Sequence, residues 1–237
     1  DWALGCLLGS ASCSGWWFGN IDFGGKDIFI KSESGPQTTI LKPANIGIPV
    51  VSFIGNETSS ATLKGFTLSG GGTIRGSAIQ LNNSSPTIEN CIITNSKGEG
   101  AISFYYSSAT LKNCLIYNNT GSNPLYFDLS TSSPEFINCT IANNIGYGAG
   151  YSAPALTIAP IFRNSILWGN TSGGATGRYT IENSIVEGGF PSGLSVLAAD
   201  PLFVNPGNGD FKLSDYSPAI GTARSSTATV EDLADSD

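Results

Sequence analysis

A six-residue phrase that returns along the chain constrains the fold more than any other feature. Each copy has an apolar residue, an outward-pointing residue and Asn or Gly, followed by an apolar, an outward-pointing and an apolar residue. The Asn or Gly stands at positions 65, 90, 113, 138, 164 and 183, so the steps are 25, 23, 25, 26 and 19 residues. A repeat of this period, with short strands around an Asn, predicts a solenoid.

Each repeat contains a further short segment with strand-like alternation before the phrase. These segments lie at 51–53, 79–81, 102–104, 125–127 and 156–158. Stretches rich in Gly, Asn, Ser and Pro separate them from the phrase, as expected for turns between strands. Three strands and three turns in roughly 24 residues make one coil of a parallel β-helix, which buries its apolar face only by stacking on its neighbours. The sequence thus predicts an all-β, parallel β-helix of about seven coils.

The two ends of the chain depart from the repeat. Residues 1–19 are rich in Trp and Leu, and we expect them to form an apolar N-terminal cap before the β-helix at 20–200. An open solenoid exposes its core and its strand edges, so a C-terminal cap is expected as well, at 201–221, closing the last coil. The small polar residues of 222–237 are typical of a linker or tail.

The composition excludes several classes of function. Charged residues make up only 12% of the chain, which suits a secreted or cell-surface protein made soluble by hydroxyls and amides. The net charge of −7 leaves no basic stripe for nucleic acid, and no apolar run approaches the length of a membrane span. Because the chain has no His, Ser/His/Asp and Cys/His catalytic arrangements are unavailable. We expect no cofactor and no metal site.

Two residue types at the phrase positions are expected to face the core. Cys91, Cys114 and Cys139 share one repeat position and are predicted to be stacked, buried thiols acting as small apolar residues. Cys6 and Cys13 lie outside the repeat, and whether they form a disulfide is left open. The Asn residues of the phrase can adopt left-handed backbone angles at a sharp corner. They are predicted to form a buried amide ladder that starts at Gly65 and continues through Asn90, Asn113, Asn138, Asn164 and Asn183.

The phrase SSPTIENCIITNS at 84–96, its echoes, and the DPLF, NGDF and SPAIG motifs near the C-terminus carry a family resemblance. Over roughly residues 20–221 the chain resembles the right-handed parallel β-helix repeat proteins that bacteria secrete, in the pectate-lyase-like solenoid superfamily. The resemblance implies a right-handed helix. It does not imply one activity, because the family includes polysaccharide lyases, glycoside hydrolases and surface adhesins. In related folds the face of the first strand often carries the active site.

The outward residues of the first strand form a candidate ligand-binding face. Amides, hydroxyls and Tyr rings on a flat sheet suit a carbohydrate chain, because rings stack on sugar faces and polar groups bond hydroxyls. The alternative is an ordinary polar exterior. The predicted ligand-binding residues are Gln80, Asn82, Ser103, Tyr105, Tyr126 and Asp128, with Thr157 continuing the column.

A catalytic role finds less support in the sequence. A glycoside hydrolase needs two carboxyl groups about 5 to 9.5 Å apart. Asp128 on the first-strand face has only Glu99, in a nearby loop, as a candidate partner, and the two are the weak candidates for catalytic residues. The face also lacks the basic cluster of a lyase and an acidic cluster for Ca²⁺.

The outward residues of the other two strands differ in character. The second strand presents Lys64, Glu89, Lys112, Ile137, Arg163 and Glu182, which we interpret as a solvated charge ladder. The third strand presents an apolar stripe, and large exposed apolar patches usually mark an interface. The predicted interface residues are Ile92, Leu115, Tyr117, Ile166, Trp168 and Ile185.

Four interpretations of this stripe remain open: long loops that fold over it, lateral packing against another protein, a sugar-stacking platform at Tyr117 and Trp168, or an ice-like surface. The sequence therefore favours an extracellular binding or surface-structural module for a polysaccharide or a protein surface. The alternatives are a polysaccharide-degrading lyase or glycoside hydrolase, and a self-assembling or adhesion protein that uses the stripe.

Overall fold

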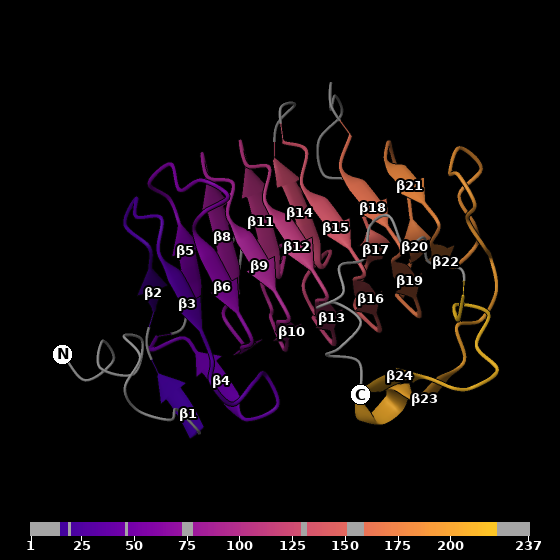
Figure 1. Cartoon of the computed structure of the whole chain (residues 1–237), viewed down its shortest axis with the longest axis horizontal. Helices are drawn as coiled ribbons and strands as arrows, with labels where there is room; N and C mark the ends of the chain where they lie inside the picture. Colours follow the sequence, from indigo (N-terminus) through magenta and orange to yellow (C-terminus); the bar gives the residue numbers. More distant parts are fainter. Residues whose placement is uncertain are drawn as a thin grey trace.

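The computed structural model describes residues 15–18, 20–45, 47–72, 78–128, 132–150 and 159–221. Within these ranges short strands wind into stacked coils, and equivalent strands of successive coils pair in parallel to form three long sheets (Figure 1). The described residues include no α-helix, and none of their helical turns has the length and apolar character that a membrane crossing requires. The predicted all-β parallel solenoid is confirmed.

Each of the three sheets is built from equivalent strands of successive coils. The first-strand sheet contains β2 (Ile21–Asp22), β5 (Val51–Phe53), β8 (Ile79–Asn82), β11 (Ile102–Tyr105) and β14 (Leu125–Asp128). The second-strand sheet contains β3 (Phe29–Lys31), β6 (Thr62–Lys64), β9 (Thr87–Glu89), β12 (Thr110–Lys112), β15 (Glu135–Ile137), β18 (Ile161–Arg163) and β21 (Thr180–Glu182). The third-strand sheet contains β1 (Gly15–Phe18), β4 (Thr39–Lys42), β7 (Thr67–Ser69), β10 (Ile92–Thr94), β13 (Leu115–Tyr117), β16 (Thr140–Ala142), β19 (Ile166–Trp168) and β22 (Ile185–Val186).

Five coils in the described residues contain a strand from all three sheets, from β2–β3–β4 to β14–β15–β16. The pairs β18–β19 and β21–β22 add two further levels to the second- and third-strand sheets. β17 (Tyr147–Ala149) and β20 (Gly173–Ala175), which follow β16 and β19 in the chain, pair as a small parallel sheet. The predicted first strand at 156–158 lies outside the described residues. Five complete coils and two partial ones therefore stand where about seven were expected.

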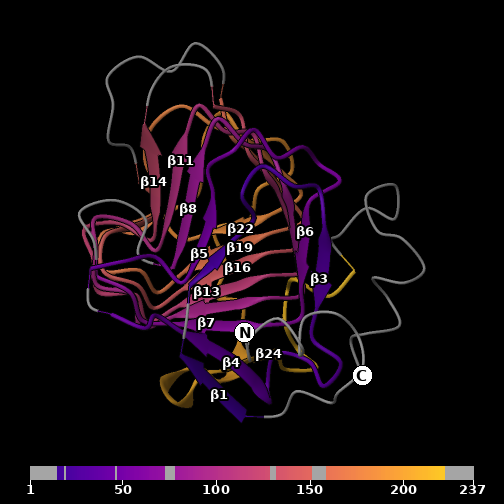
Figure 2. The same ribbon diagram turned by 90° about the vertical axis from the view of Figure 1, so that its left-hand side faces the viewer.

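The core lies between the three sheets, which enclose it when the solenoid is viewed along its axis (Figure 2). Each three-residue strand of the phrase buries its central side chain, as Ile88 does in β9 between half-buried neighbours. Because the coils are in register, large side chains stack on one another. The rings of Phe136 and Phe162 lie 4.5 Å apart and nearly parallel, and those of Phe104 and Phe127 lie 5.2 Å apart. Such columns supply the burial that one coil lacks.

The corner between the second and third strands is a single residue in the left-handed conformation. Its φ lies between 48° and 78° at Gly65 and the five Asn residues of the phrase. Asn tolerates this conformation better than other side chains because its amide bonds locally, and Gly tolerates it because it has no Cβ. The predicted left-handed corner is confirmed.

The two ends differ from simple caps placed over the coils. At the N-terminus, β1 extends the third-strand sheet by pairing with β4, while residues 1–14 and 19, with Cys6 and Cys13, lie outside the described residues. At the other end the backbone at Leu194 and Leu197 bridges to β21 and β22 and adds a partial level to the last coil. The predicted tail at 222–237 also lies outside the described residues.

The C-terminal segment (201–221) lies beside the third-strand sheet, whereas the sequence placed it over the last coil (Figure 1). It contains β23 (Phe203–Asn205), a 3-10 turn (Pro206–Asn208) and β24 (Asp210–Leu213), which pairs antiparallel with β23. The Asn143 amide donates to the carbonyl oxygen of Pro206 at 3.2 Å, and the rings of Tyr117 and Phe211 lie 5.2 Å apart. The last level is already bonded by 194–197. The segment lies along the side of the solenoid instead, where Phe203, Phe211 and Leu213 are half-buried.

Candidate functional site

The first-strand face consists of two columns of outward side chains that the register brings together. Gln80, Ser103 and Tyr126 are direct neighbours on β8, β11 and β14. Asn82, Tyr105 and Asp128 are direct neighbours two residues further along the same strands. Five of these six side chains are described: Ser103 is only 3% exposed between its neighbours, and the other four are half-buried. For Asp128 only the backbone is described.

The two Tyr rings of this face stand on adjacent coils and in different columns. Tyr126 is one coil beyond Tyr105 and two residues nearer the start of its strand, an offset of roughly 8 Å. The Tyr105 ring is braced edge-on by Tyr106, with centroids 4.7 Å apart. A diagonal pair of half-buried rings beside amides and hydroxyls is a surface on which a flat, hydroxyl-rich ligand can lie. The predicted Thr157 lies outside the described residues.

The two candidate catalytic carboxyl residues lie toward opposite ends of the strands in the first-strand sheet. Glu99 precedes β11, whereas Asp128 ends β14 and pairs with Tyr105 at the far end of β11. The four residues of β11 alone span about 10 Å. Along the backbone, the two residues are therefore further apart than the spacing of about 5 to 9.5 Å between the two carboxyl groups used in glycoside hydrolysis. Within the described residues no three His, Cys, Asp or Glu side chains group to hold a metal ion.

The outer face of the second-strand sheet is a charge ladder, as predicted. The Lys64 ammonium lies 2.9 Å from Glu89, and the Arg163 guanidinium lies 3.1 Å from Glu182 and also bonds Glu135. Glu135 was not expected to take part, because it belongs to a second outward column, two residues before Ile137. Exposed pairs of this kind contribute at most about 1 kcal/mol each, so the ladder is a solvated surface.

The third-strand stripe is partly covered. Tyr117 packs against Phe211 of the C-terminal segment, whose Gly209 backbone also approaches the Tyr117 hydroxyl. Ile166 and Ile185 are buried, and Ile92, Leu115 and Trp168 are half-buried. Of the four interpretations of the stripe, coverage by another part of the chain is therefore the one that the structure favours. The C-terminal segment covers it at Tyr117, and at Thr67 the loop that contains Pro36 does so, because the Thr67 hydroxyl donates to the Pro36 carbonyl at 2.6 Å.

Between the stripe and the C-terminal segment runs a groove of about 1120 Å³. One wall is formed by the outward residues of the third strand, Ile92, Leu115, Thr140, Ile166 and Ile185. Beside them lies the corner Asn column, formed by Asn90, Asn113, Asn138, Asn164 and Asn183. The remaining lining comes from Phe211, Leu213, Ala219 and Ile220 of the C-terminal segment and, at the first coils, from residues within 31–37. The groove therefore follows the solenoid axis from coil to coil.

The corner Asn column differs from the prediction in its burial. All five Asn side chains are half-buried and line the groove, so the expectation of a buried ladder at these positions was wrong. The ladder interaction itself is present, because the Asn138 amide donates to Asn113 Oδ1 at 3.1 Å. The left-handed corner turns the amides toward the outer surface, and the inner side of the corner is occupied by the neighbouring Cys or Ser.

A fully buried amide ladder exists one corner later, after the third strand, where the sequence did not indicate it. Asn119, Asn144 and Asn170 are at most 5% exposed. The Asn119 amide donates to Asn144 Oδ1 at 2.9 Å, and the Asn144 amide donates to Asn170 Oδ1 at 3.0 Å. The detectable signal is the doublet at Asn118-Asn119 and Asn143-Asn144, in which the first Asn adopts the left-handed corner and the second points inward.

The corner between the first and second strands holds a buried carboxylate. Glu57 is 2% exposed, and it accepts hydrogen bonds from the backbone N–H groups of Gly25 and Gly55, at 2.9 Å each, and from the Ser84 hydroxyl at 2.6 Å. Burial alone would raise the pKa of Glu57, but these hydrogen bonds outweigh it and hold the pKa below its ordinary value. The Ser84 N–H in turn donates to Ser107 in the next coil. Glu57 thus anchors a structural network.

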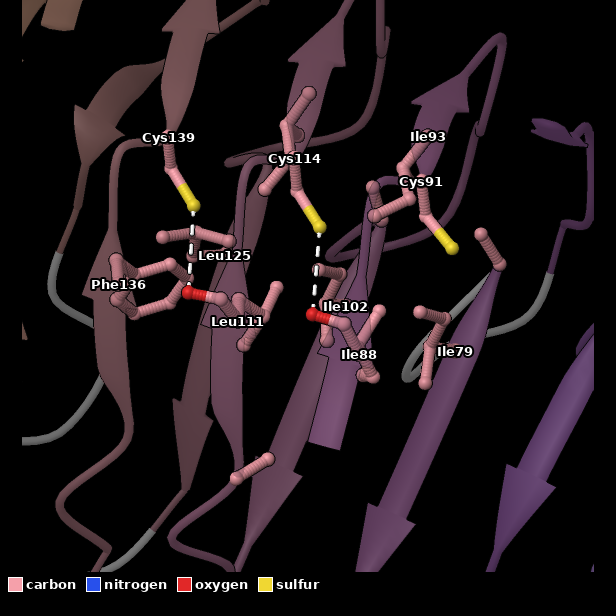
Figure 3. Packing of buried hydrophobic residues seen from close by; sticks show 14 of the residues in the cluster. Ile79, Ile88, Cys91, Ile93, Ile102, Leu111, Cys114, Leu125, Phe136 and Cys139 are labelled. Carbon is pink, nitrogen blue, oxygen red and sulfur yellow. Dashed lines mark hydrogen bonds between the residues drawn. The ribbon is translucent and has the colours of Figure 1, made fainter. Parts of the chain in front are cut away.

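The Cys column is buried, as predicted. Cys91, Cys114 and Cys139 are at most 2% exposed, and none forms a disulfide. Figure 3 shows the Cys114 and Cys139 thiols pointing at backbone carbonyls of the preceding coil, those of Ile88 and Leu111, each at 3.5 Å. Loss of solvation raises the pKa of Cys91 to about 11 and also raises the pKa of Cys114. Thiols in this state are poor nucleophiles and poor metal ligands.

The fold thus defines a β-solenoid with two outward surfaces that could hold a ligand, the first-strand face and the groove. A family model described as a right handed beta helix region matches residues 51–188, more than half of the 237-residue chain. The chain belongs to this right-handed β-helix family, which confirms the resemblance in fold and the right-handed winding. No curated protein and no solved structure matches the chain significantly.

Proposed function

We propose that the chain is a secreted or cell-surface binding module whose first-strand face holds a polysaccharide. The observation that carries the proposal is the in-register placement of Tyr105 and Tyr126 among Gln80, Asn82 and Ser103 on one flat sheet. Rings of this kind stack on sugar faces, and amides both donate to and accept from hydroxyls. The low content of charged residues, 12%, supports an extracellular location.

The test is a glycan array that also reads out product release, followed by affinity measurements on variants of the face. Tyr105→Ala and Tyr126→Ala should each weaken binding about tenfold, the factor expected for one lost stacking contact. Tyr216→Ala is the matched control, because Tyr216 is 88% exposed in the C-terminal segment and outside the face. Binding that survives both face variants would overturn the proposal, as would a protein ligand in place of a glycan.

The same array addresses catalysis. Product release that is lost in Asp128→Asn while binding is retained would establish the polysaccharide-degrading alternative. The placement of Glu99 and Asp128 at opposite ends of the sheet does not favour that outcome.

The outer face of the third-strand sheet is too small to support lateral self-assembly through the stripe. The third-strand sheet has eight strands of at most four residues. At about 4.8 Å per strand and about 10 Å across, its flat face offers about 340 Å². A stable interface needs about 800 Å² from each partner, and the C-terminal segment already covers part of this face.

A further inference from the structure

The groove is a built feature that the proposed polysaccharide face does not use. It lies on a different face of the solenoid, and its two walls come from segments far apart in the sequence. Its volume of about 1120 Å³ is slightly above the range in which proteins bind small ligands, about 300 to 1,000 Å³. The groove therefore has room for an elongated ligand of several units.

The groove repeats the same pair of side chains once per coil. An outward third-strand residue and a corner Asn recur together, as Leu115 with Asn113 and Thr140 with Asn138. Adjacent coils are about 4.8 Å apart, so a matching ligand is a polymer whose unit is about as long as one coil is high. A pyranose unit of an extended glycan has that length. An extended peptide advances about 3.3 Å per residue and falls out of step within a few coils.

The chemistry of the lining selects among glycans. Asn side chains donate and accept, as sugar hydroxyls do, while Leu115 and Ile166 offer apolar contact to the C–H faces of a sugar. Among the described lining residues only Lys31, Glu33 and Lys64 carry charge, all in the first two coils, and Lys64 is paired with Glu89. With a net charge of −7, the protein offers little attraction to an acidic polymer.

We propose that the groove binds a neutral, linear glycan along the solenoid axis, with one sugar residue per coil. The corner Asn column bonds the hydroxyls, the third-strand stripe contacts one side of the sugar rings, and Phe211, Leu213 and Ile220 contact the other. This site is independent of the first-strand face, and each of the two proposals can fail without the other.

Calorimetric titration of the whole chain with cellohexaose, mannohexaose and xylohexaose tests the groove, with hexagalacturonate as the acidic comparison. At least one neutral hexaose should bind, and hexagalacturonate should bind at least about tenfold more weakly. The combined change of Asn113→Gly and Asn138→Gly should weaken binding about tenfold, because two hydrogen-bonding amides are lost. Gly keeps the left-handed corner, as Gly65 does naturally in an earlier coil.

Two charge insertions keep the test valid if the Gly variants lose stability. Leu115→Glu and Ile220→Glu place a charge on opposite walls of the groove, and each should weaken binding at least tenfold. Ile220 is 57% exposed, so its substitution spares the core. Ile137→Glu is the matched control for Leu115→Glu. Ile137 is half-buried, as Leu115 is, but it faces outward from the second-strand sheet.

The outcomes separate the two proposed sites. The groove is supported if the groove variants lose binding of the neutral hexaose. Binding must also be unchanged in Ile137→Glu and in the double variant of Tyr105→Ala and Tyr126→Ala. No binding of any neutral hexaose at millimolar concentration overturns it. It is also overturned if the groove variants bind as the natural chain does, or if hexagalacturonate binds more tightly than the neutral ligands.

Discussion

Asn144 lies at the centre of the buried amide ladder, and its removal gives the sharpest test of what holds the coils together. Its amide nitrogen lies 3.0 Å from the Ile116 carbonyl and 3.0 Å from Asn170 Oδ1. Its amide oxygen accepts from the backbone and side chain of Asn119 at 3.0 and 2.9 Å. The amide nitrogen also donates to the Ala142 carbonyl at 3.1 Å. Asn144→Ala therefore removes five hydrogen bonds to buried polar groups.

The magnitude follows from the cost of an unsatisfied buried group, about 1–3 kcal/mol. Because neighbouring groups relax and share partners, we expect a total loss of about 4 kcal/mol in the free energy of unfolding. A domain is typically stabilised by only about 5–15 kcal/mol, so the change should be large. Asn138→Gly is the control, because Asn138 makes one ladder bond from a half-buried position, and it should cost about 1 kcal/mol.

Urea unfolding followed by circular dichroism and by Trp fluorescence measures both variants against the natural chain. Because coils of a solenoid can unfold separately, the two probes must give the same midpoint before the free energies are compared. A loss below about 1 kcal/mol for Asn144→Ala, or an equal loss for Asn138→Gly, would refute the assignment of the stabilising ladder to Asn119, Asn144 and Asn170.

Two further predictions concern Glu57 and the buried thiols. The pKa of Glu57 is held below its ordinary value of 4.5, so its carboxylate stabilises the fold above that pH, and the stabilisation is lost as the pH falls through the lower folded-state pKa. Glu57→Gln should therefore lower the unfolding midpoint at neutral pH, with a difference from the natural chain that shrinks below pH 4.5; a gap that widens in acid would contradict this. Cys91, with its pKa raised to about 11, should react with an aromatic disulfide reagent only after unfolding, together with Cys114 and Cys139. Rapid labelling of these three positions in the folded protein, located by peptide mapping, would show that the column opens.

Much of the solenoid could be predicted because its rules are local. A left-handed corner favours Asn or Gly, and the positions of Asn90 and Asn113 therefore indicate the coil length directly. Alternation around Ile88 and Leu111 then defines which side chains are buried. The charge pairs Lys64–Glu89 and Arg163–Glu182 followed from the same register.

Burial at the corners was less predictable, because both corners use Asn. The repeat of Asn at 113 and 138 resembled an inward ladder, but a left-handed residue turns its side chain outward. The inward-pointing Asn is the second residue of the corner after the third strand. Its repeat in the sequence is interrupted, because Ser96 takes the place of Asn119 one coil earlier. Single-residue columns therefore do not distinguish a surface ladder from a core ladder.

The groove could not be predicted from the repeat, because it depends on contacts between distant parts of the chain. Asn143 and Pro206 are 63 residues apart, whereas neighbouring coils meet at separations near 25. No periodic pattern in the sequence predicts that the C-terminal segment packs against Tyr117. The apolar stripe was the available signal, and it left four interpretations open, of which coverage by long loops was one.

The return of the C-terminal segment also sets an order of events in folding. Each coil needs only the preceding one as a template, so the solenoid can grow as the chain emerges from its N-terminal side. The contact between Asn143 and Pro206 closes a longer loop, at an entropic cost only about 1 kcal/mol above that of one coil. The groove is therefore completed last, by a segment that docks onto finished coils. Until that moment the part of the third-strand stripe at Tyr117 remains open to solvent and to other chains.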